Sequence, residues 1–169
     1  IIDVMFGFPS FLLSLLVVAI IGVGLWNVVF AVGLASIPHF ARIIRSAALQ
    51  VKEQPYIEAC VNLGFGRIRI MFNHILPNII PIIIVIATMD LGGAIISIAS
   101  LSFLGLGAQP PKPEWGAMLS SGREYMRYAP WTMIYPGLFL FLTVMSVNLL
   151  GDRLSQALDA RQTISKGKA

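Results

Sequence analysis

Charged side chains are scarce in this sequence. Asp, Glu, Lys and Arg make up 12% of its 169 residues, whereas soluble globular domains carry about 25% charged residues. Hydrophobic residues make up 57% of the chain, and the mean hydropathy is +0.82. This composition excludes a water-soluble fold and is typical of a membrane protein. The single cysteine, Cys60, also excludes an internal disulfide and a cysteine metal cluster.

Charges are missing from three long stretches. Residues 4–41 contain no Asp, Glu, Lys or Arg over 38 residues, residues 70–111 contain one such residue, and residues 128–151 contain none. About 20 apolar residues cross a bilayer as a helix, so the first stretch is long enough for two crossings and each of the others for one. The sequence therefore predicts an all-α membrane protein, a polytopic helical bundle. Its four membrane helices are expected at about residues 9–21, 27–48, 76–100 and 131–149.

The basic residues indicate which loops face the cytosol. The net charge is +4, but the basic residues do not form a patch interleaved with aromatic residues, so we expect no nucleic-acid partner. Basic residues accumulate on the cytoplasmic side of a membrane protein, so the loop between the second and third helices and the C-terminal tail should both be cytosolic. The segment 101–130 should then face outward. The cytosolic group comprises Arg42, Arg45, Lys52, Arg67, Arg69, Arg153, Arg161, Lys166 and Lys168.

A short amphipathic helix is expected inside the cytosolic loop. Pro55 suits the first turn of a helix, and Gly64 suits its end. Two interpretations of this helix stay open: it lies on the lipid headgroups, or it is offered to a cytosolic partner with Glu58 available for pairing. One face would carry Ile57, Cys60 and Val61, and the other Gln54, Glu58 and Asn62.

The spacing of residues in this loop resembles a known motif. Glu58-Ala59-Cys60, three residues, Gly64, nine residues and then His74-Ile75-Leu76-Pro77 is similar to Glu-Ala-Ala-x3-Gly-x9-Ile-x-Leu-Pro. That motif marks the cytoplasmic loop of the membrane subunits of binding-protein-dependent ABC importers. Cys60 departs from it at the second Ala and His74 at the Ile. Residues 101–116 and 148–161 are similar to the C-type permease of dipeptide, oligopeptide and nickel importers.

The resemblance implies a fold and a division of the chain. It implies the C-terminal part of a type I ABC importer transmembrane domain, with at least one further membrane helix ahead of it in the family. Residues 1–159 would form the permease domain, with a coupling loop at 49–75 and an outer loop at 101–130, and residues 160–169 a cytosolic tail. The coupling loop would dock in a groove of a cytosolic ATPase subunit. Its implied site residues are Glu58, Ala59, Cys60, Gly64, Leu76 and Pro77.

The resemblance also implies partners. These are cytosolic ATP-binding subunits, a second homologous permease subunit and an extracytoplasmic substrate-binding protein, in addition to the bilayer. No cofactor is expected in this chain, because ATP and magnesium would be held by the ATPase subunits. The chain contains no Gly-x4-Gly-Lys-Ser/Thr phosphate loop, so we expect no ATPase site of its own and no enzyme activity.

Other polar residues are weaker candidates. Asp90 lies within an expected span, where an ionisable group usually faces a pathway or a partner, although a structural hydrogen bond would also satisfy it. Ser97, four residues after Gly93, belongs either to the pathway or to a close helix contact. In the outer segment, Arg123, Glu124 and Arg127 are candidate contacts for a binding protein. The alternative is that this segment lies on the outer leaflet.

Three classes of function are compatible with these patterns. The first is a permease subunit of an ATP-driven importer, with peptides as the expected substrate and nickel or another small solute as the alternative. The second is a channel or secondary transporter, but a channel has no need of a cytosolic docking helix. A membrane enzyme ranks third, because no Ser/His/Asp, paired-carboxylate or metal constellation is evident in the sequence.

Overall fold

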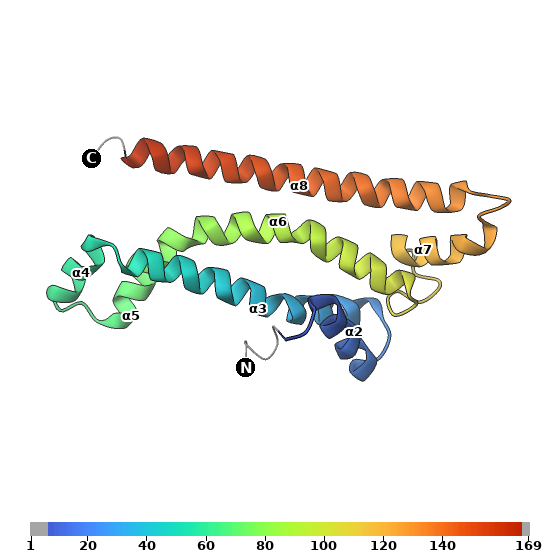
Figure 1. Cartoon of the computed structure of the whole chain (residues 1–169), viewed down its shortest axis with the longest axis horizontal. Helices are drawn as coiled ribbons and strands as arrows, with labels where there is room; N and C mark the ends of the chain where they lie inside the picture. The colour runs from blue at the N-terminus through green and yellow to red at the C-terminus, as the bar shows by residue number, and fades with distance from the viewer. Residues whose placement is uncertain (1–6, 167–169) are drawn as a thin grey trace. The chain divides into compact units, whose positions relative to one another are not determined.

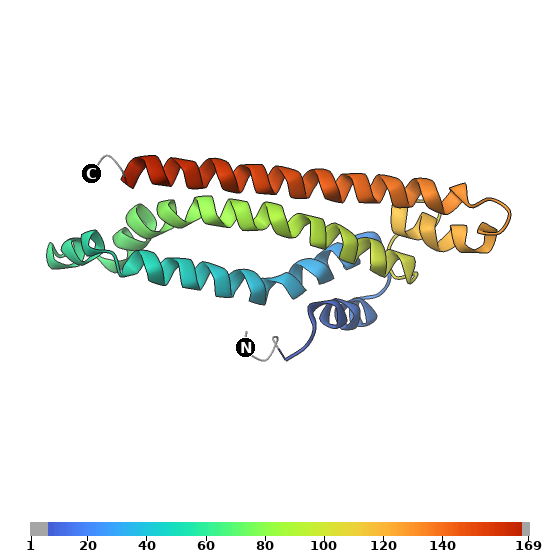
Figure 2. The same ribbon diagram turned by 45° about the horizontal axis from the view of Figure 1, so that its top comes forward.

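The computed structural model describes the backbone of residues 7–166 and the side chains of residues 7–158. Every regular element in that part of the chain is helical, which confirms the predicted all-α fold (Figures 1 and 2). The elements are α2 (Ser10–Ile21), α3 (Leu25–Lys52), α4 (Pro55–Asn62), α5 (Arg67–Ile70), the π-helix η1 (Met71–Ile75), α6 (Leu76–Phe103), α7 (Trp115–Gly122), the 3-10 helix η2 (Arg123–Tyr125) and α8 (Trp131–Lys166).

Three helical stretches are long and apolar enough to cross a membrane. They are Leu25–Lys52, Arg67–Phe103 and Trp131–Leu158. Helix α2 is apolar but has 12 residues, which gives it a length of about 18 Å, shorter than the roughly 30 Å of a bilayer's hydrocarbon core. A separate crossing by the first expected helix therefore stays a prediction.

The third expected helix begins earlier than its sequence suggests. Instead of starting near residue 76, it runs without a break from Arg67 through α5, η1 and α6. The Leu76 N–H donates to the Met71 carbonyl, five residues back, which is the wider hydrogen bond of a π-helix. Since Pro77 lacks an N–H and needs room for its ring, we attribute the unbroken passage of the helix to this wider turn.

The last helix continues well past its expected end. Helix α8 runs to Lys166, although the charge-free stretch stops at Gly151. Loss of apolar character marks the membrane boundary, but residues such as Arg, Gln, Ala and Leu in the following segment favour helix as well. The helix consequently enters the expected cytosolic tail.

The chain divides into two compact units. One unit comprises Ile1–Pro38 and Met89–Leu149, and the other comprises His39–Thr88 and Leu150–Ala169. The core of the first unit joins α2, the start of α3 and the end of α6. It consists of Val18, Val28, Ala31, Val32 and Leu101.

The turn between α2 and α3 depends on two glycines. Gly22 and Gly24 have φ angles of 95° and 147°, which side-chain-bearing residues rarely adopt. The Gly24 N–H donates to the Leu106 carbonyl over 2.9 Å, and the Asn27 amide donates to the Gly22 carbonyl over 3.0 Å. These bonds hold the turn against the segment that follows α6.

A buried hydroxyl lies at the end of α6. Ser102 is 1% exposed, and its Oγ has no hydrogen-bond partner among the residues that the structure describes. A buried hydroxyl without a partner costs about 1–3 kcal/mol. We expect Ser102→Ala to leave the thermal unfolding temperature of the detergent-purified protein unchanged or to raise it.

Ser14 provides the matched control for this substitution. It is 2% exposed, and its Oγ donates to the Ser10 carbonyl over 3.0 Å. Ser14→Ala removes a bonded hydroxyl and should bring no gain in stability. A larger loss of stability in Ser102→Ala than in Ser14→Ala would contradict the prediction.

The outer segment forms a short helix, α7. Helix α7 begins after Glu114, whose carboxylate accepts hydrogen bonds from the Gly116 N–H at 3.0 Å and the Ala117 N–H at 2.8 Å. This is an N-terminal cap made by a carboxylate. The helix ends at Gly122, where a Cβ atom would lie 2.8 Å from Met133 Cγ, and the chain then tightens into η2.

Candidate functional site

The short helix α4 forms where the loop sequence predicts it. Gln54 is extended, with a ψ angle of 140°, and Pro55 occupies the first turn, where its missing N–H leaves no helical bond unmade. Helix α4 and helix α5 lie in the loop that joins α3 to α6 (Figures 1 and 2). The helix has eight residues and is therefore about 12 Å long.

Gly64 ends α4 in a left-handed conformation. Its φ angle is +80°, its N–H donates to the Val61 carbonyl over 2.9 Å, and the Phe65 N–H donates to the Cys60 carbonyl over 3.1 Å. This pair of bonds is a Schellman motif, which requires a residue with positive φ at the position of Gly64. The prediction that this glycine terminates the helix is confirmed.

The two predicted faces of α4 are only partly realised. Ile57 is buried and Cys60 is half-buried, but Val61 is 58% exposed. Glu58 and Ala59 are exposed, so the carboxylate is accessible to another molecule. A groove of about 550 Å³ runs between the end of α3 and α4. It is lined by Leu49, Lys52, Glu53, Ile57, Glu58, Val61 and Asn62.

The side chain of His74 joins α4 to the start of the long helix. Its Nε2 lies 3.9 Å from Cys60 Sγ, and its ring is stacked on that of Phe65 with centroids 6.2 Å apart and an interplanar angle of 18°. Tyr56 also contacts it, with ring centroids 6.4 Å apart. The Arg69 guanidinium lies 4.6 Å from the Phe65 ring centroid and extends the stack.

Asn78 makes a second connection between these elements. Its Nδ2 donates to the Tyr56 hydroxyl over 3.1 Å and to the His74 carbonyl over 2.6 Å. Sequence reasoning missed Tyr56, Phe65 and Asn78, and it interpreted His74 as a departure from a motif and as a surface histidine at the membrane boundary, without a contact to α4. The sequence signal that could have indicated these contacts is the group of aromatic residues near Gly64, in a loop that otherwise contains many charged residues.

The implied site residues of this loop do not all have the same surroundings. Cys60 is in the contact cluster, whereas Glu58 and Ala59 lie on the exposed side of α4. Leu76, half-buried, and Pro77, exposed, begin α6 directly after the π-helix. Their roles in coupling to an ATPase stay predictions.

The candidate pathway residues lie on α6. Asp90 is half-buried, and the Ser97 hydroxyl donates to the Gly93 carbonyl of its own helix over 2.9 Å. This bond within the helix already satisfies the Ser97 donor. A pathway role for either residue stays a prediction.

The candidate binding-protein contacts are exposed. Arg123 and Glu124 belong to η2, and Arg127 follows it. The Arg123 guanidinium lies 5.4 Å from the centroid of the Phe103 ring, which fixes it over the end of α6. The three side chains are therefore accessible, and their contact with a partner stays a prediction.

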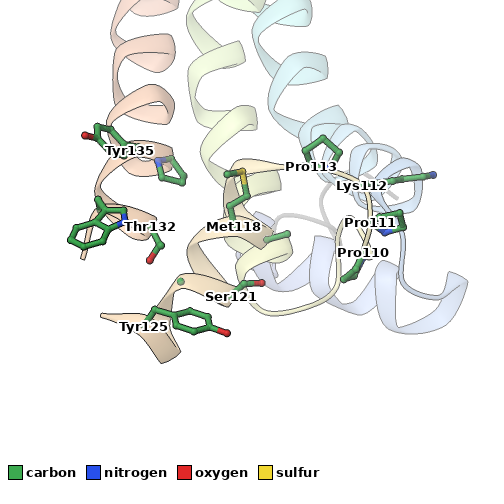
Figure 3. Close-up of a pocket in the computed structure, with 13 residues that line it drawn as sticks. Pro110, Pro111, Lys112, Pro113, Met118, Ser121, Tyr125, Thr132 and Tyr135 are labelled. Atoms are coloured by element: carbon green, nitrogen blue, oxygen red, sulfur yellow. The ribbon is translucent and has the colours of Figure 1, made fainter. Parts of the chain in front are cut away.

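A largely apolar cavity lies beside these charges. Its volume is about 520 Å³, and Figure 3 shows Met118, Ser121 and Tyr125 meeting Thr132 and Tyr135 around it. Half of the remaining lining residues come from the proline-rich segment that precedes α7, and the other half from α7 and α8. They are Pro110, Pro111, Lys112, Pro113, Ala117, Gly122, Trp131 and Pro136.

A metal site is not apparent in the part of the chain that the structure describes. Within it, no three side chains of His, Cys, Asp or Glu lie together in a way that could hold an ion. The Cys60–His74 pair alone offers two ligands, fewer than the four of a structural zinc site. The expectation that this chain holds no cofactor stays a prediction.

The long apolar helices and the exposed loop helix define a polytopic helical membrane protein. The family model described as "Binding-protein-dependent transport system inner membrane component" matches residues 1–164, so the chain belongs to this family and is an inner membrane component. The resemblance to the membrane subunits of such importers is thereby confirmed.

Curated relatives match most of the chain. The "Glutathione transport system permease protein GsiD" of Escherichia coli O1:K1 / APEC is 51% identical over 159 residues, which cover 94% of this chain and 52% of that protein. The proteins of the same name from Shigella flexneri serotype 5b and Salmonella typhimurium strain LT2 show the same identity and coverage. The chain thus spans about half the length of the curated relatives that it matches.

Proposed function

We propose that this chain is part of a permease subunit of an ATP-driven importer. It helps to form one half of the translocation pathway for a peptide, and a cytosolic ATPase subunit drives its conformational change. The observation that carries this proposal is the geometry of α4. The helix presents Glu58 to its surroundings, and Gly64 fixes its end by a Schellman motif. Its contacts with His74 and Asn78 connect it to a helix that becomes a membrane span.

A short helix held in this way can transmit motion. A push on α4 would reach α6 through packed side chains, whereas an unstructured loop would absorb it. The groove beside Glu58 offers both acidic and basic side chains, with Lys52 and Glu53 on its other wall. An ATPase subunit with a basic group in its docking groove would complement Glu58.

The remaining partners and the substrate belong to the same proposal. A second homologous permease subunit would complete the pathway, and an extracytoplasmic binding protein would deliver the solute to the outer segment. ATP and magnesium would be bound by the ATPase subunits, with no cofactor in this chain. The names of the curated relatives concern glutathione, which is a small peptide, and this favours a peptide over nickel.

Charge reversal at Glu58 tests the docking role. We expect Glu58→Lys to lower ATP-dependent peptide uptake into proteoliposomes by about tenfold or more, because losing 1.4 kcal/mol of docking energy corresponds to roughly a tenfold weaker complex. Co-purification of the ATPase subunit with the permease should fall in parallel.

Asn73→Lys is the matched control for Glu58→Lys. It adds a positive charge to an exposed position of the same loop, outside α4. We expect uptake and co-purification close to those of the unaltered protein. Full uptake and co-purification in Glu58→Lys would contradict the proposed docking role, and uptake that needs no ATP would contradict the proposed class of transporter.

A further inference from the structure

The orientation of α4 relative to the long helix must be set by specific contacts. An isolated helix of eight residues is not stable in water, so contacts with neighbouring elements must set the orientation of α4. The turn between α4 and α5, residues 63–66, is bonded to α4 by the Schellman motif of Gly64 and Phe65. Both bonds of that motif go to carbonyls of α4, so the connection of α4 to η1 and α6 depends on other contacts.

His74 bridges this turn through side chains. It lies 14 residues from Cys60 in sequence, yet its Nε2 approaches Cys60 Sγ at 3.9 Å. On the same ring, Phe65 stacks from the turn and Tyr56 contacts from the first turn of α4. His74 thus contacts both ends of α4 and the turn that follows, from a position inside the π-helix that leads into α6.

The contacts around His74 are of kinds that keep a fixed geometry. Aromatic pairs and cation–π contacts depend on the orientation of the rings, and the Arg69 guanidinium lies over the Phe65 ring, 4.6 Å from its centroid. Asn78 adds a hydrogen bond from α6 to the Tyr56 hydroxyl. His74 is half-buried, so the contacts are partly shielded from water.

We propose that His74 is a positioning residue that makes α4 and the start of the membrane-spanning helix move as one body. A displacement of α4 by an ATPase subunit then passes to α6 instead of being absorbed by the glycine-containing turn. This inference rests on the proposed function, because it assigns the means by which the same loop transmits motion. Its local part, the immobilisation of α4 by His74, is a property of the chain itself and can be measured without any partner.

The test compares His74→Ala with Asn73→Ala, a matched change at the exposed neighbouring residue. Hydrogen exchange is measured on the purified permease, and the ratio of peptide imported to ATP hydrolysed is measured on the complete importer. We expect the α4 amides of His74→Ala to exchange about tenfold faster, while the α7 amides keep their rate and show that the fold is intact. The same variant should bind the ATPase subunit but import about tenfold less peptide per ATP, and Asn73→Ala should behave as the unaltered protein.

Two further variants keep the inference testable if His74→Ala does not accumulate. His74→Phe retains a ring beside Phe65 and Tyr56, and we expect it to preserve the import ratio to within about threefold of the original. Tyr56→Phe deletes the hydroxyl that accepts from Asn78 and should lower the import ratio relative to the unaltered protein, by less than about tenfold. A loss of about tenfold or more in His74→Phe, or an import ratio in Tyr56→Phe equal to that of the unaltered protein, would overturn the inference.

The outcomes separate the inference from the function on which it rests. Unchanged α4 exchange and an unchanged import ratio in His74→Ala, or equal losses in Asn73→Ala, would overturn the positioning role. If the unaltered permease binds no ATPase subunit and imports nothing with ATP, the proposed function fails. In that case the exchange experiment still reports whether His74 immobilises α4.

Discussion

Gly64→Val is expected to abolish ATP-driven uptake while leaving the membrane-spanning helices folded. Gly64 adopts a φ angle of +80°, and a β-branched residue is strongly disfavoured there. Among the described residues, no atom beyond Gly64 and its two chain neighbours lies within 4 Å of the place that a Cβ would occupy, so the effect comes from the backbone and not from a clash. The strain is about 1–2 kcal/mol for an ordinary residue and larger for valine, which is branched at Cβ.

Relief of that strain would undo the Schellman motif. The Phe65 N–H and the Gly64 N–H would lose their carbonyl partners on α4, and Phe65 would leave the His74 ring. We therefore expect a loss of uptake of at least about tenfold, since coupling between two sites is typically worth 1–3 kcal/mol. Uptake and ATP hydrolysis in proteoliposomes measure this loss, and circular dichroism checks that the helices persist.

Gly66 provides an unusually close control. It lies two residues away, and a Cβ there would also meet nothing within 4 Å, but its φ angle is −63°. Gly66→Ala should therefore leave ATP-driven uptake unchanged. Gly64→Asn should retain part of the activity, because asparagine tolerates positive φ better than other residues do. Equal activities of Gly64→Val and Gly66→Ala would show that the left-handed turn is not needed.

Gly116→Ala is expected to produce a large loss of stability for a change of a single methyl group. A Cβ at this position would lie 2.8 Å from Ala99 Cα and from the Ala99 carbonyl carbon, and closer still to the carbonyl oxygen. These are backbone atoms within α6, which cannot move aside as a side chain can. Helix α7 would have to separate from α6 to make room for the methyl group.

Overpacking of this kind costs about 1–3 kcal/mol or more. For a protein of this size we expect the unfolding temperature in detergent to fall by roughly 5 °C or more. Gly137→Ala is the control, because a Cβ there would meet Leu119 Cδ2 at an ordinary 3.7 Å and should bring a small gain in helix stability. An unfolding temperature for Gly116→Ala equal to that of Gly137→Ala would contradict the close contact between α7 and α6.

The parts of the fold that depend on local chemistry could be predicted from the sequence. Runs without charge indicated the long apolar helices. Pro55 and Gly64 indicated the bounds of α4 to within two residues, because proline and glycine each restrict or permit backbone conformations at their own position. The continuous passage through Pro77 could not be predicted. It depends on a π-turn in the preceding residues, and no single residue type demands such a turn.

The same limit applies to the candidate site. The exposure of Glu58 follows from its place on an amphipathic helix, whereas the contacts of His74 depend on how two segments separated by a turn meet in space. Tyr56 and Asn78 are 22 residues apart, and no periodicity links them. Sequence patterns could therefore locate the loop but could not find the residue around which it is organised.

The cap on α7 changes the electrostatic character of the outer segment. By formal charge, residues 101–130 carry Lys112, Arg123 and Arg127 against Glu114 and Glu124, a net of 3 − 2 = +1. The carboxylate of Glu114 faces two backbone N–H groups and the positive end of the helix dipole, so much of its field is compensated within the protein. Close to Glu114, this surface therefore presents a less negative potential than the formal charge of the carboxylate suggests.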